Sequence, residues 1–308
     1  MKIILLGPQR RPTLDGVVRS LGLGSGLSGR VATVTAGWQE REPDDAELAA
    51  LLGGRAVNLG LYRRWLDVQD RDPEYFAGAR RLADTLAELQ DLYLLRLDYA
   101  LGAVYAVQRR SASRDAVQDA VAAVRELDTG HLRRVNGARL EFFEQLAPHD
   151  RPVIAGHRAE VSAALADAAA LIIAGGHVGV LAEVLHLFNL AAVARSPVIA
   201  WSAGAMALTD RIVLFHDRAP QGPGHPEMYA SGLSVVRDAV LLPHARARLL
   251  LDDTARMAVF ARRFGPARCI LLENGTRIEI DGAGWPPGVR VIGEDGRVTL
   301  LETALEAS

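Results

Sequence analysis

The apolar residues in the first part of the chain alternate between two spacings. "KIILLG" (residues 2–7), "RVATVTA" (30–36) and "AVNLGLY" (56–62) are short runs rich in apolar residues, which is typical of buried strands. Between them, residues 13–21 and "PDDAELAALLGG" (43–54) have helical spacing, the second with Asp44 or Asp45 as its cap and glycines at its end. This order predicts a parallel, doubly wound sheet.

From Glu74 to Leu146 the chain shows helical spacing without any strand signal. Three successive runs have this spacing, namely Leu82, Leu86, Leu89, Tyr93, Leu97, Leu101 and Val104, then Val117, Val121 and Val124, then Leu132, Val135, Leu140 and Phe143. The pattern predicts a helical insertion over residues 74–146. Its apolar positions occupy more than one helix face, so we expect a lid, part of a substrate channel, or a surface that binds a second copy of the chain.

After the insertion, strand and helix signals alternate again. "RPVIAG" (151–156), "AALIIAGG" (169–176) and "SPVIAW" (196–201) are predicted strands, separated by helices over 158–166 and 180–190. The tail adds "RIVLFHD" (211–217), "DAVLLPH" (238–244), a helix near 247–263, and hairpin signals at Asn274-Gly275 and Asp295-Gly296. We therefore expect a single α/β domain over residues 1–308, with a flavodoxin-like parallel sheet flanked by helices, the helical insertion and a C-terminal β-hairpin.

Composition narrows the classes of partner. The formal net charge is −2 over 308 residues, which provides no electrostatic footprint for nucleic acid or an anionic membrane. The only cysteine, Cys269, lies in the apolar run "ARCILL" and reads as a buried structural residue. The N-terminus lacks a signal-peptide pattern, and the long apolar region over 168–201 is interrupted by glycine and by polar and charged residues. We expect a cytoplasmic protein with a small substrate.

A serine stands directly after the predicted strand "SPVIAW". Ser202 is followed by Ala203 and Gly204, and such small residues favour a tight turn from strand to helix. A nucleophilic serine needs this setting, because it must be exposed at a strand end with backbone N–H groups aimed at the developing oxyanion. The alternative is a serine that caps the following helix. Spacing alone leaves both open.

Three further strand ends carry residues that fit a hydrolase. Gly175 and Gly176 close the strand before Ser202, Asp217 ends "RIVLFHD", and His244 ends "DAVLLPH". Each has an ordinary structural explanation, as turn glycines or as surface and core residues. The order serine, acid, histidine is nevertheless one that triads on α/β sheets use.

These motifs, "GG", "WSAGA" and "PHARARL", resemble the peptidase E and cyanophycinase family of serine peptidases, which have the class I glutamine-amidotransferase-like fold. The resemblance implies that Ser202 is the nucleophile, that His244 is the general base, and that the N–H groups of Gly176 and Ala203 form the oxyanion hole. It also places Asp217 where the acid of the triad is expected. Glu273, in "LLENG", is a second carboxylate at a late strand end that could contribute to the site.

The chain departs from that family after the glycine pair. His177-Val178 stands where family members have the Asn-Thr or Asp-Gln pairs that help to place substrate, so His177 is a candidate substrate contact. Arg246 and Arg248 follow His244, with Arg256 further along, and arginine forks suit carboxylates. We therefore expect small anionic peptides as substrates, while a solvated helix face is the other explanation for these arginines.

Other patterns carry less chemistry. "GSGLSG" (24–29) has dinucleotide-type glycine spacing but follows a helix instead of a strand. His216 and His225 flank Asp217 without a matching set of metal ligands, so we expect a solvated loop there and no metal.

The prediction for the whole chain is a peptidase E-like exopeptidase with a Ser-His-Asp triad and no cofactor. The alternatives are a cyanophycinase-like hydrolase and an inactive binding protein on the same fold. Glutamine-dependent amidotransfer is disfavoured because it uses a cysteine at the position of Ser202.

Overall fold

A six-stranded sheet forms the centre of the computed structural model, which describes residues 1–9, 14–21, 29–110, 113–194, 197–217, 224–281 and 284–302. The strand order is β10-β1-β5-β4-β2-β3, and all neighbours are parallel except β10 with β1. The strands of this sheet are β1 (Ile3–Leu6), β2 (Arg30–Val34), β3 (Ala56–Asn58), β4 (Ala168–Ile173), β5 (Val198–Trp201) and β10 (Arg277–Ile280). The expected parallel, flavodoxin-like arrangement is confirmed.

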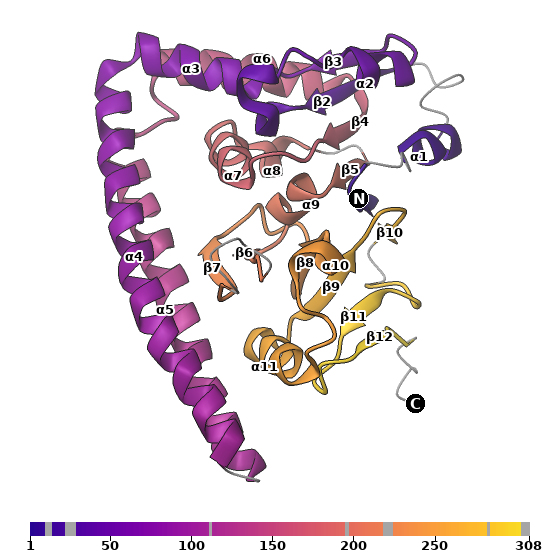
Figure 1. The fold of residues 1–308 in the computed structure, drawn as a ribbon. Helices are drawn as coiled ribbons and strands as arrows, with labels where there is room; N and C mark the ends of the chain where they lie inside the picture. The colour runs from indigo at the N-terminus through magenta and orange to yellow at the C-terminus, as the bar shows by residue number, and fades with distance from the viewer. Residues whose placement is uncertain are drawn as a thin grey trace, which may run out of the picture.

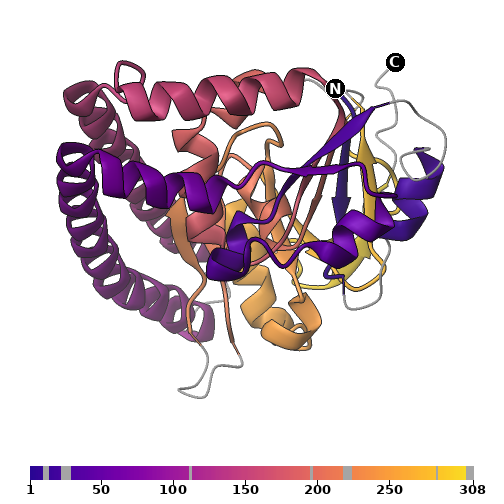
Figure 2. The same cartoon turned by 90° about the horizontal axis from the view of Figure 1, so that it is seen from above.

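Helices cover both faces of this sheet (Figures 1 and 2). They are α1 (Leu14–Ser20), the 3₁₀ helix η1 (Ala36–Arg41), α2 (Ala46–Leu51), α3 (Leu61–Arg71), α6 (Pro152–Ala166), α7 (Val178–Leu187), α8 (Leu190–Val193) and α9 (Ala203–Ala207). Strand side chains alternate between the two faces, so in β1 Ile4 and Leu6 pack with α1 and α2, while Ile3 and Leu5 join the core on the opposite face. Burial on both faces explains why β1, β4 and β5 are continuous apolar runs.

A second, four-stranded sheet follows in the order β12-β11-β9-β8. Its strands are β8 (Ala239–Pro243), β9 (Arg268–Leu272), β11 (Arg290–Ile292) and β12 (Val298–Leu300), and the helices beside it are α10 (Ala245–Arg248) and α11 (Thr254–Phe264). β8 and β9 are parallel, and β11 and β12 form the expected C-terminal hairpin. A separate two-stranded ribbon is made by β6 (Ile212–Leu214) and β7 (Glu227–Ala230).

The predicted insertion is a pair of long helices, α4 (Pro73–Arg110) and α5 (Arg114–Leu146), which we call the helical hairpin. The two helices run side by side along one side of the molecule (Figure 1). The second and third predicted runs are therefore one continuous helix, α5. Ser113 caps this helix by accepting a hydrogen bond from the N–H of Ala116.

A buried polar cluster joins the helical hairpin to the C-terminal half. Arg263 of α11 donates from Nε and Nη2 to the two carboxylate oxygens of Asp128 on α5, each at 2.7 Å. The Tyr93 hydroxyl of α4 donates to Asp128 at 2.8 Å and accepts the N–H of Met228 on β7 at 3.0 Å. Arg263 also donates to the carbonyl of Pro226 at 2.7 Å. The cluster thus fixes the ribbon against the hairpin, because every partner of Arg263 is buried with it.

Several predicted elements differ from the structure. The single helix expected near 247–263 is two helices, α10 and α11, because the chain leaves the helical conformation after Arg248. "RPVIAG" was expected to be a strand, but Pro152 starts helix α6, a position where its fixed φ and missing N–H suit the first turn. The strand expected over 56–62 ends at Asn58, and Gly60, at φ 59°, begins α3. The turn at Asn274-Gly275 joins strands of different sheets, because β9 pairs with β8 and β10 pairs with β1, so no hairpin forms there.

The buried cluster generates a stability prediction. Asp128→Ala leaves the Arg263 guanidinium buried without its carboxylate, and removal of one partner of a buried pair costs about 3–5 kcal/mol. We expect a loss of that size in the free energy of unfolding, measured by urea denaturation. Asp119→Ala, at an exposed site on the same helix, is the matched control and should change the value by less than about 0.5 kcal/mol. Equal effects of the two substitutions would contradict the assigned role of the cluster.

Candidate active site

Ser202 occupies a strained turn between β5 and α9. Its backbone has φ 50° and ψ −120°, a conformation that non-glycine residues rarely adopt. Ser202 stands at the N-cap position of α9, yet its side chain makes no capping hydrogen bond. The alternative of a simple helix cap therefore has no support from the contacts, and the hydroxyl is left for another use.

Glycines make this turn sterically feasible. A Cβ on Gly204 would lie 2.5 Å from the carbonyl oxygens of Ile173 and Ala174, so α9 packs directly on the end of β4. A Cβ on Gly175 would lie 3.1 Å from the Cβ of Ser202. Gly176, at φ 129°, approaches the backbone of Gly37, where a Cβ would lie 2.3 Å from the carbonyl oxygen. The ends of β4 and β5 can therefore meet only with glycine at these positions.

A cavity of about 400 Å³ opens beside Ser202. Gly176 and Ala203, the expected oxyanion-hole residues, line it together with Ser202. Its other walls come from α7, α9, the ribbon and the segment after β8, and the remaining lining residues are Val178, Met206, Leu214, Phe215, His216, Gly224, His225, Glu227, Pro243 and Arg248. The structure thus brings the predicted nucleophile and oxyanion-hole residues to one cavity wall.

His244 follows Pro243, a cavity-lining residue, at the carboxyl end of β8. Its backbone is left-handed, with φ 58° and ψ 32°, and its N–H donates to the carbonyl of Leu272 at 3.2 Å. α9, which begins after Ser202, packs against β8. Ser202 and His244 therefore occupy the starts of two neighbouring short helices, each at the end of a parallel strand.

The two candidate acids lie in different surroundings. Glu273 comes directly after β9, whose Leu272 pairs with Pro243, and its Oε1 accepts the N–H of Arg246 at 2.7 Å. This places the Glu273 carboxylate at the first turn of α10, which His244 begins. Partial exposure of Glu273 leaves its carboxylate accessible to a neighbour.

The Asp217 side chain is fully buried, with 0% exposure. Arg256 donates to both of its oxygens, at 2.6 Å and 3.1 Å, and the N–H of Leu250 donates to Oδ2 at 3.1 Å. Arg256 also donates to the carbonyl of Gly224 at 2.6 Å. Asp217 and Arg256 therefore form a buried ion pair. This pair also binds the backbone of Leu250 and Gly224, and Gly224 lines the cavity.

Among the predicted substrate contacts, Arg248 lines the cavity. Arg246 is exposed on α10. His177 is also exposed and caps α7, because its Nδ1 accepts the N–H of Val180 at 3.2 Å. Glu273 lies at the start of α10, outside the cavity lining.

Glu227 lines the cavity but was not predicted as a site residue. Glu227 of β7 is partly buried, and burial raises the pKa of its carboxyl. The Gln90 amide of α4 donates to Oε2 at 3.0 Å, and Gln90 Oε1 pairs with His131 of α5 at 2.9 Å. No cation forms an ion pair with Glu227 within the described ranges. The only sequence signal for it is the short run "EMYA".

His225 also differs from the solvated histidine expected in this loop. Its ring is partly buried in the cavity wall, and burial lowers the pKa of the imidazole. Nε2 lies 3.3 Å from Asp98 of α4, whereas Nδ1 is buried without a hydrogen-bond partner in the part of the chain that the structure describes. The helical hairpin thus contacts two side chains that line the Ser202 cavity.

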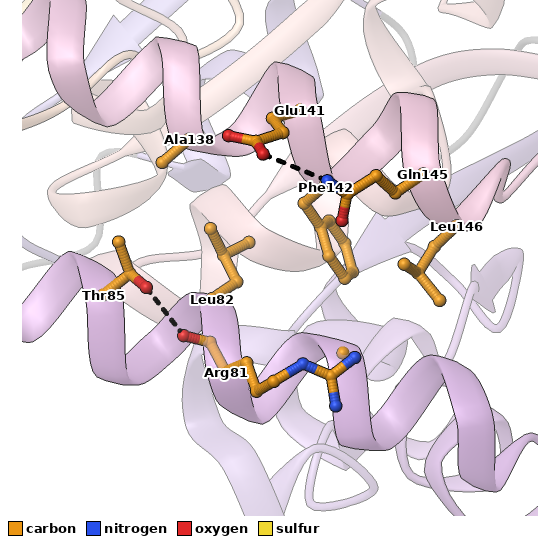
Figure 3. A pocket seen from close by; sticks show the side chains of 9 residues that line it. Arg81, Leu82, Thr85, Ala138, Glu141, Phe142, Gln145 and Leu146 are labelled. Carbon is orange, nitrogen blue, oxygen red and sulfur yellow. Dashed lines mark hydrogen bonds between the residues drawn. The ribbon is translucent and has the colours of Figure 1, made fainter.

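A smaller hollow of about 160 Å³ lies between α4 and α5, far along the chain from Ser202 (Figure 3). Two contacts close its polar side, one from the Thr85 hydroxyl to the carbonyl of Arg81 and one between Gln145 and Glu141 at 3.0 Å. Both pairs are i and i+4 neighbours within one helix. Both are local contacts within a helix, and the hollow lacks the serine and glycines that line the larger cavity.

The described residues contain neither a cluster of metal ligands nor a membrane-spanning helix. No group of three or more histidine, cysteine, aspartate or glutamate side chains there could hold a metal ion. None of the helices in those ranges is both long enough and apolar enough to cross a membrane.

No protein-family model matches the chain, and no curated protein does. Among solved structures, the chain is similar to a peptidase from an acI-B1 Actinobacterium, with 14% sequence identity and a TM-score of 0.44. The match covers 98% of this chain and 94% of that chain. At this distance the likeness carries no argument about the site.

The raised pKa of Glu227 generates a pH prediction. The folded state binds the Glu227 proton more tightly than the unfolded state does, so this group lowers stability as the pH rises above its ordinary pKa of 4.5. Glu227→Gln removes the charge and keeps an oxygen that can accept from Gln90. We expect the variant to be more stable than the wild type at about pH 7.5 and equal to it at about pH 3.5, by urea denaturation. A difference that is independent of pH would contradict this reasoning.

Proposed function

We propose that the chain is a serine hydrolase that cleaves amide bonds in short peptides. The observation that carries this proposal is the strained backbone of Ser202, beside a cavity that Gly176 and Ala203 also line. Backbone strain of this kind persists only where the surrounding structure enforces it, and it clusters at functional sites. A turn from strand to helix that exposes a serine among small residues is the usual setting of a nucleophilic serine.

The proposed reaction has two halves. His244 accepts the proton of the Ser202 hydroxyl as the oxygen attacks the substrate carbonyl, and the N–H groups of Gly176 and Ala203 stabilise the oxyanion. His244 then donates that proton to the leaving amine as the C–N bond breaks, which leaves an acyl-enzyme. In the second half His244 takes a proton from water, the resulting hydroxide attacks the ester, and Ser202 regains its proton as the acid product leaves.

Glu273 is the better-supported carboxylate for orienting His244. It follows the strand paired with β8, and it accepts the N–H of Arg246 in the helix that His244 begins. Asp217, the acid expected from the sequence, remains the second candidate. Its two oxygens already accept hydrogen bonds from Arg256 and Leu250, which supports a structural role for it.

The cavity charges support a peptide as the substrate. Arg248 and Glu227 both line the cavity, and neither forms an ion pair within the described ranges. Arginine suits a carboxylate, and a carboxylate suits an ammonium group. A short peptide with free termini would supply both, and the volume of about 400 Å³ suits a ligand of that size.

The nucleophile is tested with Ser202→Ala. A fluorophosphonate probe should label the wild type at Ser202, located by mass spectrometry, and should not label the variant. On any dipeptide that the wild type cleaves, kcat should fall by a factor on the order of 10⁴ or more. Ser231→Ala is the control, because the Ser231 hydroxyl is bonded by Asn136 and lies outside the cavity lining. Absence of labelling in the wild type, or turnover retained without Ser202, would reject the hydrolase.

A second test separates the two acids. Glu273→Gln should lower kcat by about 10²–10⁴-fold, as loss of an orienting carboxylate does, with little change in the free energy of unfolding. Asp217→Asn should instead lower that free energy by weakening the bonds to the Arg256 guanidinium, with kcat per folded molecule nearly preserved. Circular dichroism gives the folded fraction. The reverse pattern would assign the acid to Asp217.

A further inference from the structure

The outward side of α4 carries an unpartnered apolar seam. Leu92, Leu95 and Tyr99 are 54%, 58% and 74% exposed, although each is a large apolar or aromatic residue. Their spacing of three and then four residues continues through Gly102 to Ala106. This is the heptad spacing of a coiled-coil seam, with Leu92, Tyr99 and Ala106 at a positions and Leu95 and Gly102 at d positions.

This seam is separate from the one that holds the hairpin together. The buried side chains of α4 are Tyr75, Leu82, Tyr93, Leu97, Leu101 and Val104, and these pack in the core with residues of α5. Exposed Leu92 stands five positions before buried Leu97, and exposed Tyr99 stands five positions before buried Val104. Residues five positions apart in a helix point about 140° apart, so the exposed seam lies on the side of α4 that faces away from the hairpin core. Figure 1 shows α4 at the outer edge of the molecule.

Charges flank the exposed seam asymmetrically. Asp84 and Asp91 stand seven residues apart along one flank, at g positions, and Asp98 occupies the next g position, where it contacts His225 of the same chain. Arg96 stands on the other flank, at an e position. Neither Asp91 nor Arg96 has an ion-pair partner in the described part of the chain. The spacing of five residues from Asp91 to Arg96 is that of the g-to-e′ ion pair between parallel helices.

We propose that the seam on α4 binds the same seam of a second copy of this chain, in a parallel two-stranded coiled coil. A twofold axis along α4 brings Leu92 against Leu92 of the partner subunit and Leu95 against Leu95 of the partner subunit. The same axis places Asp91 beside Arg96 of the partner subunit twice. An antiparallel arrangement would instead place the acidic flank of one copy against the acidic flank of the other, which is repulsive. The charge pattern therefore favours a second copy of this chain as the partner, with the two α4 helices parallel.

The seam is short, so the dimer is a weak one. Two heptads with Gly102 and Ala106 at their end bury a small area, at the low end of specific interfaces, and the dissociation constant should be in the micromolar range. The proposal does not depend on Ser202, so failure of the proposed function leaves it intact.

The first experiment is sedimentation velocity of the full chain from about 1 to 100 µM. The wild type should shift from monomer to dimer with concentration, and Leu95→Asp should raise the dissociation constant by more than about tenfold. Leu140→Asp is the matched control, because Leu140 is 59% exposed on α5 and lies off the seam, and it should leave the constant unchanged. A monomeric wild type at the highest concentration, or equal behaviour of the two variants, would overturn the proposal.

Charge exchange tests the pairing itself. Asp91→Arg and Arg96→Asp should each weaken the dimer by about two- to tenfold, and the double exchange should restore it, because it swaps the two charges of each pair. A double variant weaker than both single variants would overturn the pairing.

Disulfide cross-linking tests the direction. Gly102→Cys should form a disulfide with the same residue of the partner subunit, which only the parallel arrangement brings within reach. The native Cys269 is buried and does not compete. Failure of this variant to cross-link while the dimer forms would exclude the parallel arrangement.

Discussion

The close approach of two parallel strand ends is the constraint on which the site depends. β4 ends in Gly175-Gly176 and β5 ends in Ser202, and α9 begins so near to β4 that only a glycine fits at residue 204. This contact leaves Ser202 no relaxed conformation, because the chain must turn from strand to helix within one residue. The strained serine and the glycines beside it are therefore one structural device. Their common result is a serine that lines the cavity and does not cap the helix that it precedes.

The far wall of the cavity depends on long-range contacts. The ribbon that carries His225 and Glu227 has few contacts of its own, since it contains only two short strands. Arg263 of α11 donates to the carbonyl of Pro226, and Tyr93 of α4 accepts the N–H of Met228. Asp128 of α5 in turn accepts hydrogen bonds from both of these side chains. The helical hairpin therefore has a structural role at the cavity whether or not it also binds a second copy. This explains why an insertion so long is fixed along its middle by buried polar groups.

The sequence predicts those parts of the fold whose signals are local. The strands of the central sheet are recognisable because burial on both faces requires apolar runs, as in β4 and β5. The prediction of a strand at "RPVIAG" was wrong because the β-branched residues Val153 and Ile154 were given more weight than Pro152, which starts α6. Ser202, Gly176 and Ala203 could be selected as candidates because they are close in sequence to strand ends, and the structure places all three at one cavity. Glu227 and His225 could not, because tertiary contacts with the hairpin bring them to the cavity.

The charges around the cavity fall into two groups, and this division bears on function. Asp217 and Arg256 neutralise each other in a buried pair, and an isolated buried carboxylate there would be costly. Arg263 and Asp128 do the same beneath the ribbon. Arg248 and Glu227 lack such partners in the described residues although both line the cavity. An unpaired, partly buried carboxylate adds no stability to the fold, whereas the proposed peptide substrate would supply the ammonium group that pairs with it.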